Sequence, residues 1–357
     1  MEKQSREIII LGAGLAGLTL AYQLKKSGID ALVLEARDRI GGRIHTIENG
    51  GTTLELGATW FADKHVNLIN LLIELGIEKI EQAYGKYGIY ELADGEKQLF
   101  EMPPQPEATY RVKGGTSTLI NAFFKTLDSA QIQLDQIVRE VNYQGGLFRI
   151  QTEKKEQYLS QYLISTLPPT LMVNSIVFSP NLPDSLTSIA RQTHTWMGES
   201  LKVGFFSPTP FWLEKGIGTF YSQKGPLTEF YDHSNEYGFA MKGFMHDGFV
   251  TLPKAEREKA VRAQLTNIFG EDNCSEITYQ EEAWRDQKFT HTNYKQPVAP
   301  HQNNGNTLLR EPLFNGQMFM AGSEVAPSFP GYMDGAVEAA GLVANELILE
   351  LTSSTKA

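Results

Sequence analysis

Three glycines near the N-terminus have the spacing of a phosphate-binding turn. Gly12, Gly14 and Gly17 follow the apolar residues 8–11, which are typical of a buried parallel strand. We expect Gly12 to permit a tight turn, Gly14 to let the backbone approach a pyrophosphate, and Gly17 to let the next helix pack on the strand. The free N–H groups and the dipole at the start of that helix favour phosphate. The pattern therefore predicts a dinucleotide site.

An acidic residue stands where the ribose of such a dinucleotide is bound. The helix is expected over residues 15–26, and a second strand over 31–34 ends at Glu35. Glu35 lies 21 positions after Gly14, close to the roughly 20 residues of the dinucleotide pattern. Strand, helix, strand and acid in this order strengthen a motif that is weak alone. The alternative is a glycine-rich turn in an unrelated α/β fold.

The residues after Glu35 carry a family resemblance. Residues 35–43, with Arg37 and the pair Gly42 and Arg43, resemble the ExxxRxGGR signature of the flavin-containing amine oxidase superfamily. A glycine pair lets the backbone approach a pyrophosphate, which an arginine can bind with two N–H groups. Residues 56–60 resemble a family stretch that lies along the flavin, and residues 321–324 resemble one that closes over its phosphate and ribityl groups.

A strand near the middle of the chain carries the strongest catalytic candidate. Residues 201–212 resemble a stretch of the monoamine oxidases with the same spacing from Lys202 to Trp212. In that family the lysine holds a water beside flavin N5, and the resemblance implies this role for Lys202. The alternative is a surface lysine on a strand.

Two tyrosines match the aromatic cage of the family. Residues 284–294 resemble the segment that ends with Cys-Tyr in the mitochondrial enzymes, so Tyr294 matches one wall and Tyr332 the other. The resemblance implies that an amine binds between these rings by dispersion and electrostatics. Asn293 replaces the cysteine that carries the covalent flavin there, which implies non-covalent FAD. The alternative is that both tyrosines pack in the core.

The resemblance assigns FAD contacts to a set of positions at both ends of the chain. These positions are Gly12, Gly14, Gly17, Glu35, Arg37, Gly42, Arg43, Gly57, Ala58, Thr59, Val138, Ser323, Glu324 and Met333. The histidines are scattered without paired ligand spacing, so we expect no metal site.

The leading hypothesis is an FAD-dependent amine oxidase. Hydride passes from the amine Cα to flavin N5, the imine is released, and oxygen reoxidises the flavin to give hydrogen peroxide. Two alternatives stay open: a desaturase or protoporphyrinogen oxidase-like enzyme, and a non-catalytic FAD-binding protein. The sequence leaves open the substrate, the electron acceptor and the oligomeric state.

The elements that must position these residues predict an α/β fold. We expect a Rossmann-like FAD-binding domain and a discontinuous α+β substrate domain, as in monoamine oxidase-type flavoproteins. The FAD-binding domain is predicted over residues 1–67, 112–190 and 289–357, and the substrate domain over 68–111 and 191–288. Their interface is a natural pocket.

Composition is consistent with this prediction. The chain has 357 residues, 41% of them hydrophobic and 21% charged, with a net charge of −10. The absence of a basic run argues against nucleic acid, and the acidity would mildly attract a cationic substrate. Cys274 is the only cysteine, which fits a reducing cytoplasm. Neither a signal-peptide pattern nor an apolar run of about 18 residues occurs, so we expect a cytoplasmic protein without a membrane anchor.

Overall fold

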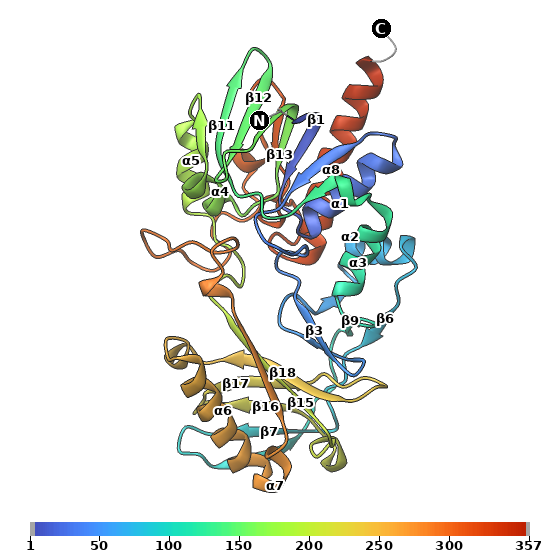
Figure 1. Cartoon of the computed structure of the whole chain (residues 1–357). Helices are drawn as coiled ribbons and strands as arrows, with labels where there is room; N and C mark the ends of the chain where they lie inside the picture. Colours follow the sequence, from blue (N-terminus) through green and yellow to red (C-terminus); the bar gives the residue numbers. More distant parts are fainter. Residues whose placement is uncertain (1–3, 355–357) are drawn as a thin grey trace.

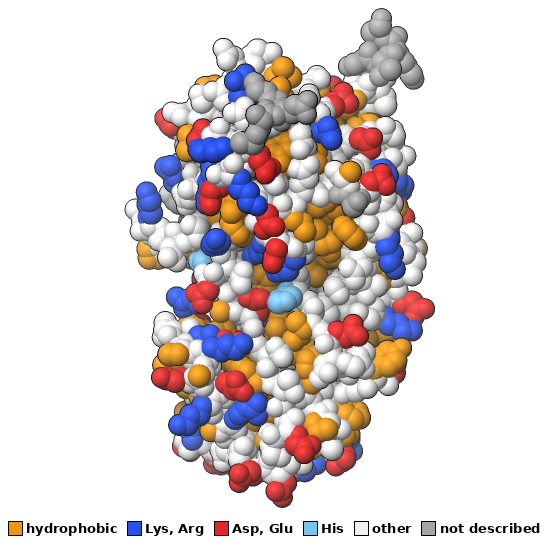
Figure 2. Space-filling model, viewed as in Figure 1, with side chains coloured by type: hydrophobic (Ala, Val, Ile, Leu, Met, Phe, Trp, Pro, Cys, Tyr) orange, Lys and Arg blue, Asp and Glu red, His pale blue; other side chains and the backbone are white. Residues whose placement is uncertain are grey.

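The computed structural model describes residues 4–354 and shows two lobes (Figure 1). The upper lobe of this view contains an eight-stranded sheet, and the lower lobe contains a seven-stranded sheet. Acidic and basic side chains are interspersed over the face shown in Figure 2. Within residues 4–354, no helix is both long and apolar enough to span a bilayer.

The eight-stranded sheet forms the centre of the first lobe. Its strand order is β10-β2-β1-β13-β12-β11-β14, with β20 also paired to β13. The strands are β1 (Gln4–Leu11), β2 (Ala31–Leu34), β10 (Ile132–Gln133), β11 (Val138–Gln144), β12 (Leu147–Thr152), β13 (Gln157–Ser165), β14 (Val177–Ser179) and β20 (Met318–Met320). The pairs β10–β2, β2–β1, β1–β13 and β13–β20 are parallel.

Helices cover both faces of this sheet, which explains its continuous apolar strands. On β1, Ile8 and Ile10 pack into one core, and Ile9 and Leu11 pack into another. Four helices contribute to the first core: α1 (Leu15–Lys26), α2 (Val66–Glu74), α3 (Ser117–Thr126) and α8 (Met333–Ser354). The second core includes residues of α4 (Pro169–Ser175) and α5 (Asp184–Arg191).

The seven-stranded sheet forms the second lobe. Its order is β19-β15-β18-β17-β16-β7-β8. The strands are β7 (Tyr87–Glu91), β8 (Lys97–Glu101), β15 (Leu201–Ser207), β16 (Ile217–Ser222), β17 (Leu227–Asp232), β18 (Phe239–Met245) and β19 (Thr278–Ala283). One face packs on α6 (Lys254–Phe269) and α7 (Glu271–Cys274) through residues such as Phe205, Phe230 and Val261. The opposite face of β15 and β18 contacts β4 (Thr52–Glu55).

Short strands connect the lobes. β3 (Thr46–Asn49) pairs with β4, and β9 (Thr109–Val112) pairs with β5 (Phe61–Ala62) and β6 (Lys79–Glu81). The segment 68–111, which is predicted to belong to the substrate domain, is shared between the two lobes. α2 packs on α8 of the first lobe, whereas β7 and β8 join the second sheet.

The α/β fold class predicted from the sequence is confirmed. α1 and β2 have the predicted bounds, 15–26 and 31–34. Their positions follow from local signals, because apolar runs and glycines mark where each element begins and ends.

Candidate active site

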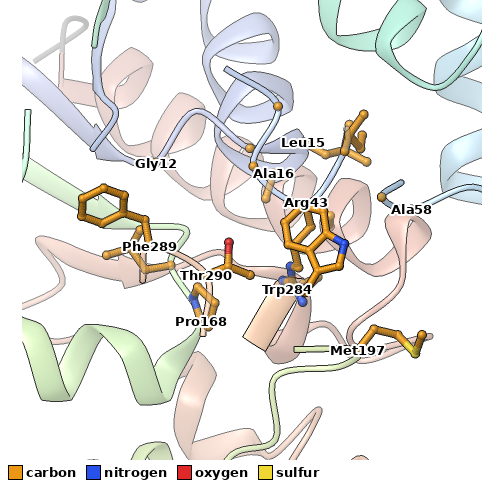
Figure 3. A pocket seen from close by; sticks show the side chains of 18 of the residues that line it. Gly12, Leu15, Ala16, Arg43, Ala58, Pro168, Met197, Trp284, Phe289 and Thr290 are labelled. Atoms are coloured by element: carbon orange, nitrogen blue, oxygen red, sulfur yellow. Dashed lines mark hydrogen bonds between the residues drawn. The ribbon is translucent and has the colours of Figure 1, made fainter. Parts of the chain in front are cut away.

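A cavity of about 780 Å³ runs between the lobes. It is lined by the first βα turn, by the loops after β2 and β4, and by the face of the second sheet that contacts β4. In Figure 3, Gly12, Leu15 and Ala16 line one side, and Trp284, Phe289 and Thr290 lie across from them. We call this the main cavity.

Glycines form one end of the main cavity. Gly12 has φ +102°, which an L side chain rarely adopts. A Cβ on Gly17 would lie 2.0 Å from the Gly12 carbonyl oxygen, so only glycine lets α1 pack this closely. A Cβ on Gly42 would lie 3.1 Å from Gly14 Cα, so two backbone loops meet here. No side chain caps the N-terminus of α1, which leaves its N–H groups for a phosphate.

Glu35 lies at this end and is buried. Its Oε2 accepts the Ala13 N–H at 2.7 Å, and its Oε1 accepts the Arg37 N–H at 2.9 Å. A carboxylate accepts up to about four hydrogen bonds, so both oxygens retain capacity for ribose hydroxyls. Val138, on β11, also lines this end. Arg37 itself donates to Thr290 Oγ1 at 2.6 Å, and desolvation lowers its pKa.

An ion pair joins the two ends of the chain beside the cavity. Arg43 donates to both carboxylate oxygens of Glu324, at 2.6 and 3.0 Å, and to Ser323 Oγ at 2.8 Å. The Glu324 side chain is fully buried. The sequence predicted a cofactor contact for Arg43; in this structure its two terminal nitrogens bind Glu324.

Lys202 lies at the other end of the main cavity. It projects from β15, is buried, and donates through Nζ to the Gly57 carbonyl oxygen. Its Nζ also lies 5.2 Å from the centre of the Phe244 ring. Gly57, Ala58 and Thr59 line the cavity beside it. The structure therefore does not place Lys202 on the surface.

A second buried lysine adjoins this end, and sequence reasoning missed it. Lys242, on β18, is fully buried, donates to Thr59 Oγ1, and lies 4.2 Å from the centre of the Trp60 ring. Desolvation, followed by the charge of Lys202, holds its pKa well below the ordinary value. Glu55 is also buried, and burial raises its pKa against the influence of Lys242.

The structure separates the two predicted cage tyrosines. Tyr332 and Met333 line the main cavity, and the Tyr332 ring lies 5.9 Å from the ring of Trp196. Tyr294 does not line the cavity; its hydroxyl accepts the Thr195 N–H at 2.8 Å, and its ring stacks on His194. Among the described residues, Tyr294 and Tyr332 make no ring contact with each other.

An aromatic chamber with one carboxylate extends the cavity beyond Lys202. Glu229 on β17 lies opposite Phe244 on β18, which lies opposite Lys202 on β15. Opposite residues share a face, so the three side chains form one row. The row spans two strand spacings, about 10 Å. Trp60, Tyr84 and Tyr231 complete the chamber. Apolar and polar residues do not alternate strictly over residues 227–232, so the sequence predicts no strand there and gives no signal for Glu229.

The buried lysine makes a stability prediction. Burial lowers the pKa of Lys202 from 10.5 to about 8. Between these pH values the unfolded chain binds the proton that the folded protein has released, so this group makes the free energy of unfolding rise with pH. Below pH 8 both states are protonated and the effect is constant. In denaturant unfolding, the free energy of unfolding of the wild type should rise relative to that of Lys202→Met by on the order of 2–3 kcal/mol between pH 8 and 10.5. A constant difference would contradict the burial of Lys202.

Comparison with known proteins identifies the family. The model of flavin-containing amine oxidoreductases matches residues 15–109 and 95–348. A probable flavin-containing monoamine oxidase A of Dictyostelium discoideum is 23% identical, covering 98% of each chain. Amine oxidase B of Sus scrofa is 23% identical over 96% of this chain and 86% of its own. Among solved structures, putrescine oxidase has a TM-score of 0.83 at 21% identity, covering 98% of this chain and 100% of that one. Cyclohexylamine oxidase from Brevibacterium oxydans also has a TM-score of 0.83, at 19% identity, covering 97% and 99%. The chain therefore belongs to the family of flavin-containing amine oxidoreductases.

Proposed function

We propose that this protein oxidises an amine to an imine with FAD and oxygen, and that the amine carries a second cationic group. Bound FAD would supply acceptance of a hydride from the amine Cα and transfer of two electrons to oxygen, which yields hydrogen peroxide. The main cavity carries this proposal, because it joins a dinucleotide cradle to a chamber that contains Lys202 and Glu229.

The residues of the cradle fit FAD. The uncapped start of α1 and the contact between the loops of Gly14 and Gly42 suit a pyrophosphate, and Glu35 suits the adjoining ribose. Arg43 and Ser323 line the main cavity, and Arg43 is held in place by the buried Glu324. Both terminal nitrogens of Arg43 bind the buried Glu324 carboxylate and balance its charge. We therefore expect the glycine backbone, and not Arg43, to contact the phosphates.

FAD binding is proposed to be non-covalent. Asn293 occupies the position of the family's flavin-linking cysteine and is exposed. The chain's single cysteine, Cys274, is buried in the core of the second lobe and is not among the residues that line the main cavity. No thiol is therefore placed to form a thioether.

Acid precipitation tests this proposal. The purified yellow protein should release its flavin into the supernatant, because only hydrogen bonds and packing hold it. Absorbance of the supernatant and pellet measures the partition. Flavin that remains with the precipitated chain would contradict non-covalent binding.

Charge decides which nitrogen reacts. Lys202 is largely protonated at neutral pH, because its pKa is about 8. A cation at this place disfavours an ammonium group beside it, so the reacting amine binds there as the free base. Lys202 donates one N–H to the Gly57 carbonyl oxygen. An ammonium group has three N–H donors, so the other two can orient a water or the cofactor.

The second cationic group would bind Glu229. Among the described residues no lysine, arginine or histidine forms an ion pair with this carboxylate, which accepts the Tyr231 hydroxyl at 2.7 Å. The rings of Trp60, Tyr84 and Phe244 add faces that attract cations. Putrescine, with which putrescine oxidase was solved, is a diamine of this class.

The amine reaction is tested by anaerobic flavin reduction. Diamines should bleach the flavin absorbance, and admission of oxygen should restore it with release of hydrogen peroxide. Tyr332→Leu keeps bulk but loses a π face, so it should slow bleaching about fivefold to tenfold. Tyr294→Leu is the matched variant: equal slowing would restore the two-tyrosine cage, and unchanged bleaching would favour Trp196 and Tyr332 as walls. Failure of every amine to bleach the flavin would reject the function.

Glu229→Gln tests the substrate class. The loss of a charge-assisted hydrogen bond should raise KM for a diamine by about tenfold or more and leave KM for a monoamine of similar length nearly unchanged. Steady-state oxygen uptake measures both values. Glu101→Gln, on the exposed edge strand β8 of the same sheet, is the control. Equal changes for both substrates would show that Glu229 does not bind a second cation.

A further inference from the structure

A second cavity of about 250 Å³ lies where the lobes meet. It is enclosed by β4, by the turn between β9 and α3, and by the loop between β17 and β18. Figure 1 shows β3 and β9 at this junction. Its lining includes Glu55, Arg111, Thr116 and His233, and the proposed amine oxidation uses none of them.

Arg111 is a buried cation without an anionic partner. The residue is 7% exposed, and desolvation lowers its pKa. Its Nη2 donates to the Ser234 carbonyl oxygen at 3.2 Å, and its Nε is buried without a hydrogen-bond partner. Among residues 4–354, no carboxylate lies within ion-pair distance of it. A buried guanidinium in this state is costly unless something in the cavity accepts its N–H groups.

Two further polar atoms at the same cavity have no partner. The Thr116 hydroxyl and His233 Nδ1 make no hydrogen bond within the protein. Both atoms are buried, since Thr116 is only 1% exposed and His233 only 2%. Buried polar groups are nearly always hydrogen-bonded, so an unpartnered one needs an explanation. Two of the three atoms, Arg111 Nε and the Thr116 hydroxyl, are hydrogen-bond donors of residues that line this cavity, and one bound molecule that accepts from both would satisfy them.

The surrounding charges favour a small singly charged anion. The Glu55 carboxylate is already satisfied by the Thr46 hydroxyl and the Thr116 N–H. Asp232, which acts on Arg111 through its charge, accepts the Trp212 indole N–H and the Ser234 hydroxyl. Protein groups already donate hydrogen bonds to both carboxylates, so neither needs a ligand. Their negative charges would repel a doubly charged anion more strongly than a singly charged one.

The charged side chains at the rim of the second cavity are exposed to solvent, which screens their charges. Lys113 pairs with Glu78 at 2.7 Å on the exposed side, and Glu236 is exposed. Selectivity therefore rests with the buried donors.

We propose that the second cavity binds a small carboxylate or comparable oxyanion, held by the guanidinium of Arg111 and the hydroxyl of Thr116. This site is separate from the main cavity and does not depend on the proposed amine oxidation. Formate and acetate are small enough for it, and chloride offers charge without the two oxygens that Arg111 and Thr116 would share.

Calorimetric titration of the FAD-loaded protein with sodium formate and sodium acetate tests the proposal. Ionic strength is held constant with sodium chloride. The wild type should bind one of these anions saturably and melt at a higher temperature with it than in chloride alone. Binding needs no turnover, so failure here leaves the amine reaction untouched, and failure of the amine reaction leaves this site untouched.

Thr116→Val is the decisive variant, because the hydroxyl it removes has no partner within the protein. In chloride its melting temperature should match that of the wild type, while its Kd for acetate should rise about tenfold. Arg111→Gln should abolish binding. Lys113→Gln removes a cation at the rim and should change Kd by less than about threefold.

Two outcomes would overturn the proposal. One is the absence of saturable binding of formate and acetate by the wild type, which would mean that water alone fills the cavity. The other is weakening by Lys113→Gln as large as that by Thr116→Val, which would show diffuse attraction to the surface.

Discussion

The pair between Arg43 and Glu324 is the interaction on which the site depends. It joins residues 281 positions apart, and the Glu324 side chain is excluded from solvent. An unpaired carboxylate in such a place costs several kcal/mol, so the two segments are stable only together. The loop between β2 and β3 and the turn before α8 are thereby fixed against each other. The positions of Arg43 and Ser323 in the lining of the main cavity follow from this contact.

The charges inside the second lobe obey a related constraint. β15 and β18 each carry a lysine on the face turned toward β4, with Glu55 nearby. Each lysine donates to an atom of residues 57–59, which line the main cavity. Burial raises the pKa of Glu55 and lowers the pKa of both lysines, because desolvation disfavours the charged form of each group. Apolar packing on the other face of the sheet keeps this arrangement rigid.

Local patterns explain how much could be predicted. The glycines, α1, β2 and Glu35 follow from signals within about 30 residues, and the structure has them where expected. Tyr294 matches the cage position of the family in sequence. The segment around it has no regular secondary structure, however, and its hydroxyl accepts a hydrogen bond from the Thr195 N–H. No periodic pattern determines the path of such a segment. Glu229 and Lys242 could not be assigned to a site from the sequence, because the position of a residue on a strand does not reveal what each face of the sheet contacts. Parallel pairing of β7 with β16 is likewise a long-range event without a local signal.

The topology of the first sheet bears on the order of folding. β1 lies between β2 and β13, and β13 in turn pairs with β20, which begins only at Met318. α8 then packs on α1. The lobe of the first sheet is thus completed by β20 and α8, which follow the whole second sheet along the chain. Contacts of such long separation slow folding and leave apolar strands exposed meanwhile. Removal of β20 and α8 would therefore take away part of a lobe whose first strand is β1, because β20 pairs with β13 and α8 packs on α1.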